Sequence, residues 1–366
     1  MVDRSTHPRD LSPFGNHLIV GLSGPSLSDE DKKVLESLRP VGVLLLARNF
    51  VYGKPYGDWI HSLDTLLAEV KRYAGRSQML VTLDHEGGSV VRTPHPITRF
   101  PPPCLLREQS YNVARATGRE LCSLGVNVSW APLADINSNP NNPIIGVRAL
   151  SSDPVEVATF AREYARGLSD AGVLGCAKHF PGHGDTSTDS HLELPVLATS
   201  RDVLVQRELV PFRDLCSDGI PLVMTAHVLF PAIDPSEPAT FSRTLIHDLL
   251  RGELGYDGVV VSDDLEMKAI SRRVDEEGAV VEPFIAGCDL TIVARYLNPR
   301  IDHLFSMAHV FSERVEGDAN FANQMSNARR RIDSLLGKIP MPAVEVLARE
   351  VLENHARLSI EVAFGR

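Results

Sequence analysis

The sequence has few cysteines, and their spacing favours neither a disulfide framework nor a thiolate metal site. The five cysteines lie far apart, they are odd in number, and no two of them are spaced as CxxC: Cys104, Cys122, Cys176, Cys216 and Cys288. Free thiols in a reducing compartment are therefore expected.

Long apolar runs and blocks of basic residues are also lacking. No stretch approaches the roughly 18 apolar residues of a membrane-spanning helix, and the segment from Met1 to Phe14 has no apolar core of the kind found in secretory signals. The formal net charge is −10, which argues against nucleic acid or an anionic membrane as the main partner. We expect a cytoplasmic protein, monomeric and without a metal or cofactor, that acts on a small molecule.

Short β-rich runs alternate with longer helical patterns along the whole chain. The runs fall at residues 17–22, 41–46, 79–83, 126–133, 173–177, 222–226, 258–262 and 289–293. Eight strands separated by helices predict an α/β fold, a TIM-like (β/α)8 barrel, and a doubly wound open sheet is the alternative. Because no linker or repeat divides the chain, we expect residues 1–366 to form a single catalytic barrel domain, with 298–366 a helical C-terminal extension packing on it.

Polar residues follow most of these runs at the point where the strand ends. In a barrel such positions meet at one face, where active sites lie. A lone Asp after a strand is more often a helix cap than a catalyst, but capping explains poorly why so many strand ends are polar: Arg48 and Asn49, Asp84 to Gly88, Asp135, Lys178 and His179, His227, and Asp263 and Asp264.

The densest polar stretch runs from Lys178 to His191, after the fifth strand. Lys178 ends a buried run, so it is either neutralised by a carboxylate or bound to substrate. Asp189 and His191 are two residues apart, and a loop can fold them into a carboxylate–imidazole pair that exchanges protons near neutral pH. A solvated loop is the alternative.

Two further groups of charged residues near strand ends are candidates for catalysis or sugar binding. Asp263 follows an apolar strand, and a carboxylate there is a candidate nucleophile for an anomeric carbon. Asp264 would point the other way, and alternation alone leaves open which of the two faces the site. Arg148 suits fork-like recognition of hydroxyls or carboxylates, whereas Glu86 and Arg92 could instead form a structural ion pair.

Together these segments resemble glycoside hydrolase family 3 β-N-acetylglucosaminidases of the NagZ type. The resemblance runs in order from about Gly42 to Asp289. It is carried by Lys178-His-Phe-Pro-Gly-His-Gly-Asp-Thr186 with Asp189-Ser-His191, Asp84-x-Glu-Gly-Gly-x-Val-x-Arg92, Ile145-Gly-Val-Arg148, Glu208-Leu-Val-Pro-Phe212, Met224-Thr-Ala-His227, Ala239-Thr-Phe-Ser242, Ser262-Asp-Asp-Leu265 and Ala286-Gly-Cys-Asp289.

The resemblance implies a retaining exo-β-N-acetylglucosaminidase that releases terminal GlcNAc, with peptidoglycan-derived GlcNAc-anhydro-muropeptides as the usual substrate. It implies that Asp263 is the nucleophile and that His191, paired with Asp189, is the acid/base. It also implies that five residues hold the sugar: Asp84, Arg92, Arg148, Lys178 and His179.

The sequence departs from the family pattern at Ser89 and Val91, on the expected rim of the site, which bears on the leaving group. Many members carry a second α/β domain, and we expect the compact single-domain form here. A histidine acid/base becomes neutral when it loses its proton, which leaves phosphorolysis open beside hydrolysis. A metal-dependent barrel hydrolase using His179, His183, His191 and His227, and an inactive sugar-binding barrel, are the remaining alternatives.

Overall fold

A computed structural model describes residues 10–190, 193–274, 279–295, 301–340 and 342–365. Eight parallel strands form a closed barrel in chain order, with β8 pairing back onto β1. The barrel prediction is confirmed, and the open sheet is wrong. The strands are β1 (Leu18–Gly21), β2 (Gly42–Leu45), β3 (Leu80–Leu83), β4 (Val128–Ser129), β5 (Leu174–Phe180), β6 (Leu222–Thr225), β7 (Val259–Asp264) and β8 (Leu290–Val293).

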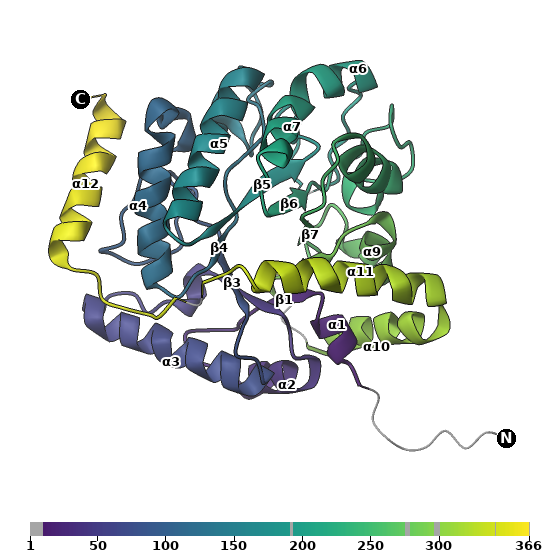
Figure 1. Ribbon diagram of the computed structural model, residues 1–366, viewed down its shortest axis with the longest axis horizontal. Coiled ribbons are helices and arrows are strands. Elements are labelled where there is room, and N and C mark those ends of the chain that lie inside the picture. The colour runs from purple at the N-terminus through teal and green to yellow at the C-terminus, as the bar shows by residue number, and fades with distance from the viewer. Residues whose placement is uncertain (1–9, 191–192, 275–278, 296–300, 341, 366) are drawn as a thin grey trace.

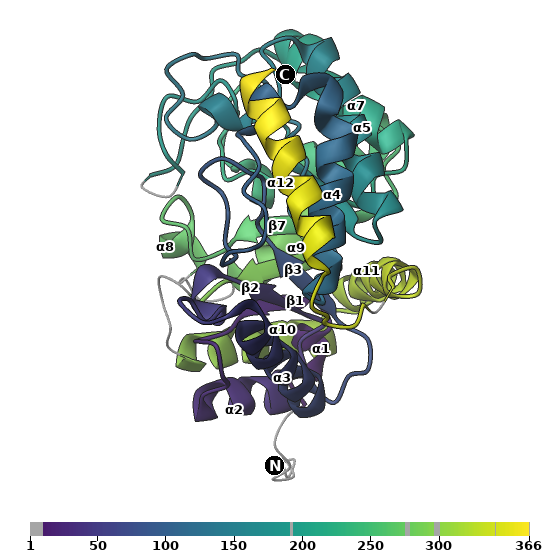
Figure 2. The same cartoon turned by 90° about the vertical axis from the view of Figure 1, so that its left-hand side faces the viewer.

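Helices surround this barrel (Figures 1 and 2). They are α1 (Ser12–Gly15), α2 (Asp29–Leu38), α3 (Tyr56–Ala74), α4 (Ser110–Ser123), α5 (Pro154–Asp170), α6 (Arg201–Val203), α7 (Leu209–Ser217), α8 (Ser271–Val274), α9 (Glu282–Ala286), α10 (Ile301–Gly317), α11 (Ala319–Leu336) and α12 (Arg349–Phe364). None of the described helices is long and apolar enough to cross a membrane.

Two helical segments differ from an ordinary α-helix. Leu204–Glu208, between α6 and α7, and Thr244–Glu253, between β6 and β7, are π-helical. Within the predicted helical extension, the last helix, α12, begins at Arg349. The division of the chain at residue 298 stays a prediction.

Strand β5 is longer than its apolar run predicts. The sequence suggests an end at residue 177, before the polar pair Lys178 and His179. In the structure the strand continues to Phe180, which pairs with Thr225 of β6, while Lys178 forms a bridge with Leu133. This extension carries Lys178 and His179 on the strand itself, so neighbouring strands fix their positions.

The amino end of the barrel is closed by α11, which lies across it (Figure 1). Ile332, Leu335 and Leu336 of this helix belong to one buried apolar cluster with Leu80 of β3 and Trp130, which directly follows β4. The carboxyl ends of the strands are therefore the end of the barrel left for polar side chains.

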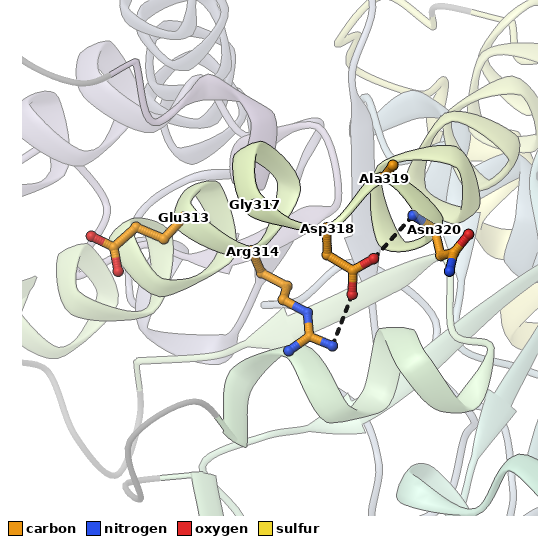
Figure 3. A pocket seen from close by; sticks show the side chains of 6 residues that line it. All are labelled: Glu313, Arg314, Gly317, Asp318, Ala319 and Asn320. Carbon is orange, nitrogen blue, oxygen red and sulfur yellow. Dashed lines mark hydrogen bonds and ion pairs between the residues drawn. The ribbon is translucent and has the colours of Figure 1, made fainter.

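Surface hollows occur beside α11. At the turn between α10 and α11, Asp318 accepts hydrogen bonds from the amides of Asn320 (3.0 Å) and Phe321 (3.2 Å) and pairs with Arg314 at 2.9 Å (Figure 3). A larger cavity of about 1180 Å³ lies between α11 and the starts of β5 and β7. Neither hollow is lined by a residue of the predicted site.

Candidate active site

Lys178 lies among carboxylates at the carboxyl end of β5. Its Nζ is 2.9 Å from Oδ1 of Asp84 and 2.6 Å from Oε1 of Glu86, both of which follow β3, and only 3% of its side chain is exposed. Burial alone would lower the pKa of Lys178, but the two carboxylates outweigh it and raise that pKa. Of the two expectations for Lys178, neutralisation by carboxylates is therefore the one observed.

Glu86 joins Lys178 to Arg148. The Arg148 guanidinium donates to both carboxylate oxygens of Glu86, from Nε at 2.8 Å and from Nη2 at 2.9 Å. Burial would raise the pKa of Glu86, but Arg148 and Lys178 hold it well below its usual range. Buried charges at three strand ends thus form one network that fixes the direction of each side chain.

Arg92 takes no part in this network, so the alternative of a structural Glu86–Arg92 ion pair is wrong; Glu86 pairs with Arg148 and Lys178 instead. The backbone carbonyl of Arg92 accepts a hydrogen bond from the Tyr52 hydroxyl at 2.7 Å. Its Nε is buried and makes no hydrogen bond in the described structure. The guanidinium therefore retains a donor for which the described chain supplies no acceptor.

Asp135, at the end of the fourth predicted strand, is the buried carboxylate that orients His179. It accepts a hydrogen bond from Nδ1 of His179 at 2.7 Å and from the backbone amide of His183 at 2.7 Å. Burial would raise the pKa of Asp135, but the two histidines hold it below its ordinary value. A carboxylate on Nδ1 leaves Nε2 of His179 as the ring atom available to other groups.

The neighbouring carboxyl groups of Asp263 and Asp264 have different surroundings. Asp263 is partly exposed and accepts a hydrogen bond from the amide of Asp264 at 2.8 Å. Burial would raise the pKa of Asp263, but His179, His227, that amide and Lys178 together lower it. It is therefore ionised at neutral pH.

The carboxyl group of Asp264 is bound by backbone instead. Its Oδ1 accepts from the amides of Glu266 at 3.2 Å and Ala294 at 3.1 Å. Burial and the nearby Glu266 raise the pKa of Asp264 to about 7. Asp264 therefore ties β7 to the end of β8, whereas the charge of Asp263 is favoured by His179, His227 and Lys178.

The predicted acid/base pair is described only in part. Asp189 lies in the loop after β5, where its carbonyl accepts from the amide of Glu193 at 3.1 Å. His191 lies outside the described residues, so its pairing with Asp189 stays a prediction.

Three of the four histidines named in the metal-site alternative, His179, His183 and His227, are described, and all three contact protein groups. Both ring nitrogens of His183 lie near hydroxyls, of Thr186 and Ser190, and His227 contacts the Thr240 hydroxyl and the carbonyl of Asp264. In the part of the chain that the structure describes, no group of three potential metal ligands is arranged around one point.

From the sequence, Asp135 had no assigned role, Glu86 was considered only as a partner of Arg92, and His183 appeared only in the metal-site alternative. Their partners lie 44 or more residues away for Asp135 and Glu86, so spacing along the chain carries no trace of these contacts. The available signal was weaker: a carboxylate directly after an apolar strand in a predicted barrel needs a partner once it is buried.

Comparison with known proteins agrees with the resemblance seen in the sequence. The family model for the glycosyl hydrolase family 3 N terminal domain matches residues 17–332. A β-hexosaminidase from Alkalilimnicola ehrlichii is 39% identical over 293 residues, covering 76% of this chain and 80% of that protein.

Solved structures agree over nearly the whole chain. A family 3 β-N-acetylglucosaminidase from Paenibacillus sp. FPU-7 superposes with a TM-score of 0.86 at 33% identity, covering 98% of this chain and 68% of that one. NagZ from Neisseria gonorrhoeae, solved with N-trifluoroacetyl-D-glucosamine, gives 0.71 at 27% identity, covering 94% and 97%. The chain therefore belongs to glycoside hydrolase family 3, among its β-hexosaminidases.

Proposed function

We propose that the protein is a retaining exo-β-N-acetylglucosaminidase that releases terminal GlcNAc through a glycosyl-enzyme formed on Asp263. The observation that carries the proposal is the contrast between the two adjacent carboxyl groups. The pKa of Asp263 is lowered by His179, His227, the Asp264 amide and Lys178, which keeps it ionised, whereas Asp264 is engaged by backbone amides. An ionised carboxylate aimed at the site is what attack on an anomeric carbon needs.

The sugar is held by residues at the ends of the neighbouring strands. Asp84 offers a carboxylate that accepts hydrogen bonds from sugar hydroxyls, while cationic and imidazole groups donate. The ion pairs of Lys178 with Asp84 and of Arg148 with Glu86 fix these groups before substrate arrives, which reduces the ordering needed at the transition state. The set is Asp84, Arg92, Arg148, Lys178 and His179.

The reaction has two steps. In the first, Asp263 attacks C1 while His191 gives its proton to the glycosidic oxygen, and the aglycone leaves. In the second, neutral His191 takes a proton from water, the water oxygen bonds to C1, and the Asp263 carboxylate is released. Asp189 holds the imidazole in the tautomer that this exchange needs.

Peptidoglycan-derived GlcNAc-anhydro-muropeptides, processed in the cytoplasm during peptidoglycan recycling, are the proposed substrates. Support comes from the similarity to NagZ of Neisseria gonorrhoeae over 94% of this chain. The ligand of that structure, N-trifluoroacetyl-D-glucosamine, is an analogue of the sugar that would be released.

Replacement of Asp263 tests the nucleophile. Asp263→Asn should lower kcat for an aryl N-acetylglucosaminide by at least about 10³-fold, because the attacking group is lost. Asp264→Asn is the matched control, since an amide oxygen still accepts from the amides that Asp264 binds, and it should retain turnover. Near-normal activity in Asp263→Asn would remove Asp263 as the nucleophile. Product analysis with and without phosphate separates hydrolysis from phosphorolysis.

A further inference from the structure

Residues 183–186, after β5, are held rigidly by the loop that follows β4. Asp135 accepts from the amide of His183, and Nδ2 of Asn142 lies 2.9 Å from the carbonyl oxygens of both His183 and Gly184. The packing is so close that a Cβ on Gly184 would lie 1.6 Å from the carbonyl oxygen of Ile136. The backbone that carries the His183 ring is therefore fixed.

The ring of His183 connects this fixed backbone to Ser190. Its Nδ1 is 2.8 Å from Oγ1 of Thr186, and its Nε2 is 3.1 Å from Oγ of Ser190. The Thr186 hydroxyl donates to the carbonyl oxygen of His183 at 3.0 Å, so it accepts from Nδ1–H. Burial lowers the pKa of His183 to about 4, and the neutral ring has one proton. Nε2 is then the acceptor, and Ser190 donates to it.

A second contact holds the backbone of Ser190. Its carbonyl oxygen accepts from the amide of Ala269 at 3.2 Å, in the segment that follows Asp263 and β7. Ser190 is thus attached through its side chain to the end of β5 and through its backbone to the chain beyond β7. It stands in the sequence between Asp189 and His191.

We propose that His183 is a positioning residue for proton transfer to the leaving group. By accepting from Ser190, its ring holds the residue that stands between Asp189 and His191 in the sequence, and through this anchor it acts on the distance from the acid to the glycosidic oxygen. The inference rests on the proposed role of His191. Proton transfer requires a donor–acceptor distance of roughly 2.6–3.2 Å, and a misplacement of about 1 Å can cost on the order of 10²-fold in rate.

Two substitutions of His183 separate the two ring contacts. In His183→Asn the amide nitrogen takes the place of Nδ1 and keeps the contact with Thr186, but the side chain is too short to reach Ser190. In His183→Gln the amide oxygen takes the place of Nε2 and can accept from Ser190. Ser190→Ala removes the same hydrogen bond from the other side, and Ser187→Ala, at an exposed serine of the same loop, is the matched control.

The readout is kcat/KM for aryl N-acetylglucosaminides whose leaving groups differ in pKa, because only poor leaving groups need the acid. In His183→Asn and Ser190→Ala, kcat/KM should fall about 10- to 100-fold for a 4-methoxyphenyl glycoside and less than about 3-fold for the 2,4-dinitrophenyl glycoside. His183→Gln should recover most of the loss, and Ser187→Ala should match the unmodified protein on both.

His191→Ala, measured in parallel, separates this inference from the function on which it rests. Suppose that His191→Ala lowers kcat/KM much more for the 4-methoxyphenyl glycoside than for the 2,4-dinitrophenyl glycoside. If His183→Asn and Ser190→Ala then lower kcat/KM equally for both substrates, the positioning role of His183 is wrong. If His191→Ala itself lowers kcat/KM equally for both substrates, the acid role of His191 is wrong, and the positioning role of His183 is wrong with it. Should His183→Asn fail to fold, Ser190→Ala alone decides between these outcomes.

Discussion

The number of cationic neighbours decides the charge of a buried carboxyl group in this protein. Glu86 has two close partners, Arg148 and Lys178, and stays ionised although burial opposes it. Glu208 is as deeply buried, 2% exposed, but its one cationic contact is the partly exposed Arg207, at 2.7 Å, and its Oε2 makes no hydrogen bond in the described structure. Burial therefore raises the pKa of Glu208 to about 6.

This raised pKa makes folding stability depend on pH. The folded protein binds the proton of Glu208 more tightly than the unfolded chain, so the contribution of Glu208 is fully present below about pH 4.5 and is lost as the pH rises through 6. The loss amounts to about 2 kcal/mol. Because glutamine mimics the protonated acid, Glu208→Gln should gain about that much relative to the unmodified protein between pH 4.5 and pH 7.

Urea unfolding of both proteins across this pH range checks the prediction. Glu253→Gln, at an exposed residue paired with Arg201, is the control, and its difference from the unmodified protein should change by less than about 0.5 kcal/mol. A stability difference for Glu208→Gln that stays constant with pH would contradict the account.

For single residues, the sequence identifies which side chains belong to the site better than it predicts their partners and directions. Asp263 and Asp264 are equivalent as neighbours in an extended strand, and the difference between them comes from the amide of Ala294, 30 residues away. The same holds for Glu86: Arg92, the partner considered as an alternative, lies near in the sequence, whereas its actual partner Arg148 comes from another loop. Pairing across strand ends depends on barrel closure, which local spacing does not encode.

At the scale of elements, Asp289 joins several parts of the barrel at its amino end. It stands directly before β8 and is fully buried. One oxygen accepts from Arg251 at 2.6 Å and from the amide of Val260 in β7 at 2.8 Å, and the other accepts from Arg331 of α11 at 2.7 Å. One carboxylate thus holds α11 in place beneath the barrel.

Loss of this carboxylate charge should destabilise the fold. Asp289→Asn leaves two largely buried guanidinium groups without their counter-charge, and we expect a loss of about 3 kcal/mol in the free energy of unfolding. Asp333→Asn, on the same helix, removes a 52% exposed carboxylate that pairs with Arg329, and it should cost less than about 1 kcal/mol. Equal losses in the two variants, measured by urea unfolding, would show that Asp289 has no special role.

Element boundaries were predictable where local signals are strong. The apolar runs predicted all eight strands. At the start of α5, Asp153 caps the helix by accepting from the amides of Val155 and Glu156, a signal that the sequence contains. The extension of β5 to Phe180 was not predictable, because Lys178 and His179 are polar and become strand residues only through their neighbours on either side. The π-helical segments have no sequence signal that we can identify.

At the scale of the whole molecule, the two ends of the barrel have separate tasks. The amino end is filled by apolar side chains and closed by α11, which gives the strands a rigid floor. The carboxyl end carries the ion pairs of Asp84, Glu86, Arg148 and Lys178. Removing these charges from water costs free energy, which close pairing between them must offset. Asp263 lies at this polar end, where His179, His227 and Lys178 lower its pKa against the effect of burial.

The most direct test is to trap the covalent intermediate. A 5-fluoro N-acetylglucosaminyl fluoride forms a glycosyl-enzyme readily and releases it slowly, so the intact mass should rise by one fluorinated GlcNAc unit per chain. Proteolysis and tandem mass spectrometry should then place the label on Asp263, and Asp263→Asn should remain unlabelled. A label on Asp264, or turnover of the reagent with no adduct formed, would contradict the assignment of Asp263 as nucleophile.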